Sequence, residues 1–165
     1  MRRRWPSYIC GIALTAGIAL CFCSAMARMA DAEEMTLQQR EAAIELAYRR
    51  GNLDEVYRLT LPVAEGGDRT FQYALSGTLL YADWAPIAGL SAADRRQLGL
   101  MWLRRAADGG EQLALAELSN SYRLGLIDLG KDSELAECFR KAVEDRSLTA
   151  ACRKMEVAKG YARER

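Results

Sequence analysis

The stretch Trp102-Leu-Arg-Arg-Ala-Ala-Asp-Gly-Gly110 decides the fold, because similar stretches occur before and after it in the chain. Its beginning recurs 36 residues later as Cys138-Phe-Arg-Lys-Ala142. Its end, Ala106-Ala-Asp-Gly-Gly-Glu111, resembles Val63-Ala-Glu-Gly-Gly-Asp68, which lies 43 residues earlier. A period near 36 residues is typical of solenoids built from helical hairpins. The difference of seven residues between the two spacings indicates a longer connection at 83–90.

Apolar residues recur at helical spacing from Met35 onward, and glycines interrupt the pattern at regular intervals. Asn52 with Glu55, and Ser91 with Asp94, have the spacing of helix N-caps. No stretch alternates with the period of a strand, so we expect an all-α chain of about seven helices. The helices are expected to contain, in order, Leu37–Tyr48, Leu53–Ala64, Phe71–Ala82, Ser91–Ala106, Ala114–Tyr122, Leu135–Ala142 and Leu148–Met155.

One helical hairpin cannot bury its apolar side alone, so the hairpins must stack into an antiparallel helical-hairpin solenoid. Small residues such as Ala74 and Gly99 are expected where neighbouring helices approach closely. The recurring aromatic residues are expected to fill the spaces between helices. These residues are Tyr48, Tyr57, Tyr73, Tyr81, Trp102, Tyr122 and Phe139.

The block Trp102–Gly110, followed by Ala114-Leu-Ala-Glu-Leu118-Ser-Asn-Ser-Tyr122, resembles the Sel1-like repeats, which are relatives of the tetratricopeptide repeats. Ser119 stands where that family usually has glycine. Upstream, Ala47-Tyr-Arg-Arg-Gly-Asn-Leu-Asp54 and Leu61-Pro-Val-Ala-Glu-Gly-Gly-Asp68 look like the opening unit of exported bacterial members. The resemblance covers about residues 45–155.

The resemblance implies a non-enzymatic adaptor that binds another protein at the bacterial cell envelope. Two alternatives remain open for the function. One is a secreted factor that acts on a host or competitor cell. The other is a weak hydrolase or peptidoglycan-binding protein, as claimed for some relatives.

The first residues have the pattern of an export signal. Arg2 to Arg4 are followed by an uncharged run, Trp5–Ala27, that ends in the small-residue site Ala25-Met26-Ala27. We therefore predict a signal peptide over 1–27, with an alternative cleavage after Ala32. A linker over 28–36 and a repeat domain over 37–165 follow.

This signal predicts a periplasmic or secreted protein. The run of 23 uncharged residues is also long enough to span a bilayer. An uncleaved signal would anchor the chain in the inner membrane with the repeat domain facing the periplasm. Any contact with the membrane would then be made through the signal segment.

Cleavage after Ala27 leaves two cysteines, Cys138 and Cys152, in a compartment that favours disulfides. The turn between their helices is centred near Asp145, seven residues from each. Both cysteines therefore lie level in an antiparallel hairpin and on the apolar stripe of their helix. This placement predicts a disulfide that closes a 15-residue loop, and the alternative is a pair of reduced, buried cysteines.

The long connection contains Trp84-Ala-Pro-Ile-Ala-Gly-Leu90, a mostly apolar segment between two helices. Exposed aromatic residues favour interfaces, so Trp84, Ile87 and Leu90 are candidate contacts with a partner protein. The alternative is that the loop folds back onto the core.

The amino-acid composition argues against several classes of function. The 165 residues carry 23 basic and 22 acidic side chains, a balance that argues against nucleic-acid binding. The chain has no histidine, which excludes a histidine-based catalytic triad and histidine-ligated metal sites. The carboxylates show no facing pair of the glycosidase kind, and no phosphate-binding glycine loop is present. We therefore expect no enzymatic activity and no cofactor.

Overall fold

The structure is a computed structural model that describes residues 35–82 and 84–162. The predicted signal segment, 1–27, lies outside the described residues, as does most of the predicted linker. The chain divides into two compact units, Met1–Leu37 and Gln38–Arg165. Only residues 35–37 of the first unit are described, and the fold below is that of the second unit.

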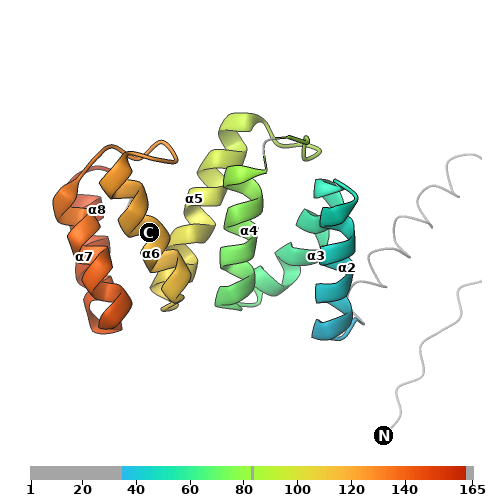
Figure 1. Cartoon of the computed structure of the whole chain (residues 1–165), viewed down its shortest axis with the longest axis horizontal. Coiled ribbons are helices and arrows are strands. Elements are labelled where there is room, and N and C mark those ends of the chain that lie inside the picture. The colour runs from blue at the N-terminus through green and yellow to red at the C-terminus, as the bar shows by residue number, and fades with distance from the viewer. Residues whose placement is uncertain (1–34, 83, 163–165) are drawn as a thin grey trace, which may run out of the picture. The chain divides into compact units, whose positions relative to one another are not determined.

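The described residues form seven α-helices and one short 3-10 helix and contain no strand, which confirms the expected all-α helical-hairpin solenoid. Figure 1 shows the helices following one another side by side in chain order. The elements are α2 (Leu37–Arg49), α3 (Leu53–Glu65), α4 (Arg69–Tyr81), α5 (Ala92–Asp108), α6 (Gln112–Leu124), α7 (Ser133–Glu144), the 3-10 helix (Arg146–Leu148) and α8 (Thr149–Ala158).

Local capping explains where several helices begin. The Asn52 side chain accepts a hydrogen bond from the Glu55 backbone N–H, and the Ser91 hydroxyl accepts one from the Asp94 N–H, as their spacing predicts. The C-terminal end of α6 is set by Gly125, whose φ of 73° lies in the left-handed region that glycine adopts easily.

Each helix from α3 to α8 packs against the next one along the chain, and α5 also contacts α8. The α4–α5 pair is especially close at Gly99. A Cβ atom added there would lie 2.6 Å from Leu80 Cγ and 3.2 Å from Leu79 Cβ, so only glycine fits. The expectation of a close approach is therefore confirmed for Gly99. It is wrong for Ala74, which is exposed.

The core consists of two clusters that meet at α5. Trp102 belongs to the cluster between α3, α4 and α5, whereas its neighbour Leu103 belongs to the cluster between α5, α6, α7 and α8. Tyr122 and Phe139 are fully buried, as expected of inter-helix aromatic residues. Tyr48 and Tyr81 differ from that expectation, because each is about half exposed.

Candidate binding groove

A groove of about 400 Å³ lies between the first three described helices, and we call it the α2–α4 groove. The volume falls in the range of about 300–1,000 Å³ that is typical of ligand-binding clefts. The lining residues come from all three helices: Glu41, Ile44, Glu45 and Tyr48 from α2, Val56 and Thr60 from α3, and Thr70, Phe71, Ala74 and Thr78 from α4.

The surface of the groove is mostly apolar, although three threonines line it. The Thr60 hydroxyl donates to the Val56 carbonyl at 2.7 Å, and the Thr78 hydroxyl donates to the Ala74 carbonyl at 3.1 Å. These hydroxyls are thus satisfied within their own helices. An occupant of the groove would gain mainly apolar contacts.

The side chains of α2 and α4 both line the groove, together with those of α3. A buried hydrogen bond of 3.0 Å from the Arg40 guanidinium to the Leu59 carbonyl holds α2 on α3. The space between α4 and α6 differs from the groove, because a hydrogen bond crosses it. The Tyr81 hydroxyl of α4 donates to the Glu117 carboxylate of α6. Burial, and then this hydrogen bond, raise the pKa of Tyr81 above its ordinary value.

The predicted contact residue Trp84 lies beside this groove. Its ring makes an edge-to-face contact with Tyr48, a groove-lining residue, with ring centroids 5.9 Å apart. Both side chains are about half exposed, Trp84 at 53% and Tyr48 at 51%. Together they form an exposed aromatic pair, which we call the Tyr48–Trp84 pair.

The loop that carries Trp84 is held to the helices around it. Arg95, a buried residue of α5, donates hydrogen bonds to the backbone carbonyls of Ala82 and Ala85. The Ala88 backbone N–H donates to the Asp54 carboxylate at 2.6 Å. These bonds hold the backbone at Ala82, Ala85 and Ala88, which are described residues near Trp84.

The other two residues expected to contact a partner are placed differently. Ile87 is only 3% exposed and packs in the core cluster with Leu53 and Trp102, so its side chain does not reach the surface. Leu90 is half-buried against the same cluster. The loop thus folds back onto the core at Ile87, which is the alternative that the sequence left open, while Trp84 stays exposed.

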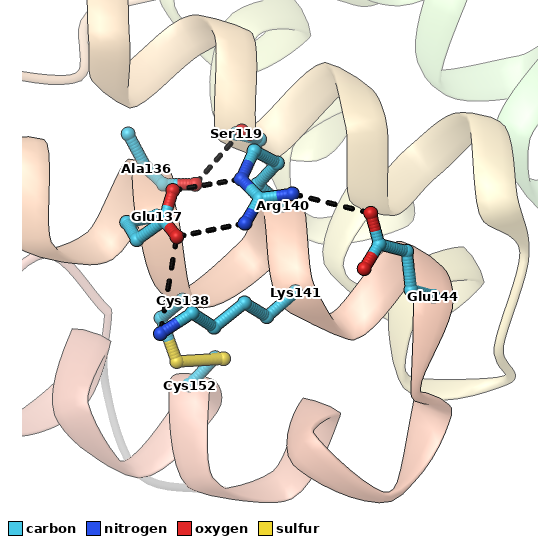
Figure 2. Close-up of polar contacts among 8 residues, drawn as sticks. All are labelled: Ser119, Ala136, Glu137, Cys138, Arg140, Lys141, Glu144 and Cys152. Atoms are coloured by element: carbon cyan, nitrogen blue, oxygen red, sulfur yellow. Dashed lines mark hydrogen bonds and ion pairs between the residues drawn. A yellow bond between two sulfur atoms is a disulfide. The ribbon is translucent and has the colours of Figure 1, made fainter.

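Cys138 and Cys152 lie level on α7 and α8, as their equal distance from the turn predicts (Figure 2). Their Sγ atoms are 2.04 Å apart and their Cα atoms 5.7 Å apart, which is the geometry of a disulfide. Cys152 is fully buried. Figure 2 also shows Arg140 of α7 between Glu137 and Glu144, an exposed set of ion pairs on the same helix.

A buried ionic cluster lies at the opposite end of the described unit from the groove. Glu156 of α8 is fully buried and forms ion pairs with Arg104 of α5 and with Arg153. Its carboxylate also accepts a hydrogen bond from the buried Tyr122 hydroxyl. Burial raises the pKa of Tyr122 to about 12, although the nearby Arg104 opposes this shift. The cluster joins α5, α6 and α8, so its evident role is structural.

Among residues 35–82 and 84–162, no group of three or more cysteine or carboxylate side chains is arranged to hold a metal ion. Across the same residues, no helix is both long and apolar enough to cross a membrane. No protein-family model, curated protein or solved structure matches this chain.

Proposed function

We propose that this chain is an exported, non-enzymatic scaffold that binds a segment of another protein in the α2–α4 groove. The observation that carries this proposal is the groove itself, an open and mostly apolar cleft with the Tyr48–Trp84 pair beside it. Binding sites on proteins are typically concave and mostly apolar, and this groove has both properties.

The sequence supports the same proposal. The Sel1-like resemblance implies an adaptor role, and the predicted signal peptide implies that the partner is met in the periplasm or outside the cell. Repeat arrays present extended surfaces, and a few buried anchors on such a surface supply most of the binding energy.

Site-specific photo-crosslinking tests this proposal. A photoreactive amino acid is placed at Ala74, which is exposed and lines the groove, and in a control protein at Ala150, which is exposed on α8. We expect a covalent adduct with one protein from the Ala74 position alone. Equal adducts from both positions would contradict specific binding in the groove.

The adduct partner is then purified and titrated against the unlabelled protein. Ala74→Arg fills the groove with a long charged side chain and should abolish binding. Ala150→Arg adds the same side chain elsewhere and should leave binding unchanged. Circular dichroism of both variants shows whether the helices are retained. Undiminished binding by a folded Ala74→Arg variant would place the binding surface elsewhere.

A further inference from the structure

The α2–α4 groove is charged on one side only. Of the lining residues that the structure describes, only Glu41 and Glu45 carry a charge at neutral pH, and both lie on α2. Glu45 forms an ion pair with Arg49, but both side chains are largely exposed. Exposed pairs of this kind contribute little, typically less than about 1 kcal/mol, so Glu45 can exchange Arg49 for another cation. An occupant therefore meets an acidic rim on α2 and an apolar floor.

The two acids have a defined spacing. Glu41 and Glu45 are four residues apart, so they lie one turn apart on the same face of α2. Ile44 and Tyr48 belong to this face and also line the groove. The acidic rim is therefore a row that runs along the helix axis.

The walls of the groove restrict the conformation of the occupant. All three walls are helices, whose backbone N–H and C=O groups are largely paired within the helix, and the N–H groups of Thr70 and Phe71 donate to the Asp68 carboxylate. An extended peptide would find no strand edge to pair with, and its own backbone groups would lose water against an apolar surface. A helix satisfies its backbone internally and can lay an apolar stripe into such a groove.

From these observations we infer that the α2–α4 groove takes an amphipathic helix of a partner protein that carries lysine or arginine beside its apolar stripe. Basic residues one turn apart on that helix match the spacing of Glu41 and Glu45. Its apolar stripe covers Val56, Phe71 and Ala74. This inference rests on the proposed function and adds the partner's conformation and charge to it.

Selection from a library of random 16-residue peptides displayed on phage tests the inference. The purified protein is the bait, and the selected peptides are synthesised and their affinities measured. We expect them to combine an apolar stripe with basic residues three or four positions apart and to gain helicity on binding. Their binding should weaken as salt is raised, because exposed charges are screened.

Charge reversal provides the decisive comparison. In the variant with Glu41→Lys and Glu45→Lys, we expect the selected basic peptides to bind about tenfold more weakly, as for the loss and reversal of two exposed ion pairs. A new selection on this variant should favour acidic peptides. Glu144→Lys, a control at an exposed acid on α7, should change neither result.

The outcomes separate the two proposals. Peptides that lose binding with Ala74→Arg but show no preference for basic residues, or no gain in helicity, would overturn this inference and leave the proposed function standing. If no selected peptide depended on Ala74, both the inference and the proposed function would be contradicted.

Discussion

Trp102 and Trp84 show how strongly the surroundings of a residue set its role. Trp102 is 3% exposed in the cluster between α3, α4 and α5, with the Arg105 guanidinium 4.9 Å from its ring centre. Trp84 is the same residue type on a loop, held in place by the bonds of Arg95 and half exposed. The first therefore belongs to the core and the second to a surface.

Trp102→Ala is expected to destabilise the fold by roughly 3–5 kcal/mol, because it leaves a large cavity beside Leu79 and Leu53. A domain of this size has little stability in excess of that amount, so the variant should be largely unfolded. Thermal denaturation followed by circular dichroism measures the effect. A shift in melting temperature of only one or two degrees would show that the ring is not buried.

Trp84→Ala is expected to leave the fold intact and to weaken partner binding by at least about 2 kcal/mol, the usual threshold for a hot-spot residue. The matched control is Leu113→Ala, which truncates another exposed apolar residue, on α6 and outside the groove. Helicity and affinity are measured for both variants. If the Trp84 variant lost helicity together with binding, its ring would have to be counted as part of the core.

Sequence patterns predicted the burial of Trp102 and the pairing of the two cysteines, and they singled out Trp84 as a candidate contact. They did not show that Tyr48 lines a groove or that Glu156 is buried. Tyr48 fits the apolar period of α2, but this period does not show that its side chain stays half exposed beside Trp84. Glu156 is charged, and its burial results from contacts with Arg104 and Tyr122, which lie 52 and 34 residues earlier. Contacts between such distant residues leave no signal in local periodicity.

At the scale of single helices, the predictions from sequence were accurate, because local interactions set the ends. Asn52 and Ser91 begin their helices through hydrogen bonds to the residue three positions on, which can be recognised in the sequence. The path of the 82–90 connection was harder to predict. It depends on Arg95 and Asp54, which bind loop backbone groups from two different helices.

The disulfide between α7 and α8 gives a prediction at this scale. Closing a 15-residue loop is worth about 3 kcal/mol in the chain-entropy account, so reductant should lower the melting temperature by several degrees. The double variant Cys138→Ser, Cys152→Ser should melt at the same temperature with and without reductant. Alkylation of both cysteines in denatured, unreduced wild-type protein would rule out the bond.

The N-terminus of α7 gives a prediction about pH. Asp132 caps this helix, and a hydrogen bond from the Lys159 ammonium lowers the pKa of its carboxyl below the ordinary value of 3.8. The stabilisation is therefore complete above about pH 4 and is lost as the pH falls through the lower, folded-state pKa. This interaction links the N-terminus of α7 to the C-terminal end of α8.

Asp132→Asn keeps the cap but removes the ion pair with Lys159. Wild type should be the more stable of the two at pH 7, and the difference should be smaller at pH 3, below the ordinary carboxyl pKa. Urea denaturation at both pH values measures this difference. A gap of constant size across this range would show that the charge of Asp132 does not stabilise the fold.

At the scale of the whole molecule, the repeat spacing was enough to predict a solenoid, but it could not predict the open groove. Periodicity shows which side of each helix faces its neighbours. Whether the side chains then fill the space between two helices depends on the sizes and positions of those side chains. The α4–α6 interval is bridged by Tyr81 and Glu117, whereas Ala74 and Thr78 leave the α2–α4 interval open.

Export is the prediction that concerns the entire chain. The basic residues Arg2 to Arg4, the uncharged run after them and Ala25-Met26-Ala27 predict a mature N-terminus at Arg28, or at Glu33 if the later site is used. Cleavage after Ala27 removes three arginines and no acid, which changes the net charge from +1 to −2. Mass spectrometry of the protein from the envelope fraction identifies the N-terminus, and a full-length cytosolic species would contradict the prediction.

The bond between Cys138 and Cys152 also determines how the chain behaves when it is pulled from its ends. With the bond closed, residues 139–151 form a loop that carries no tension, and the two Cα atoms stay 5.7 Å apart. At about 3.5 Å per extended residue, the stretched strand is then shorter by roughly 40–45 Å. A translocation pore or unfolding enzyme that admits one extended strand would meet several strands side by side at the disulfide, because the closed loop lies beside the stretched chain. Passage through such a pore is therefore possible before the bond closes and blocked afterwards.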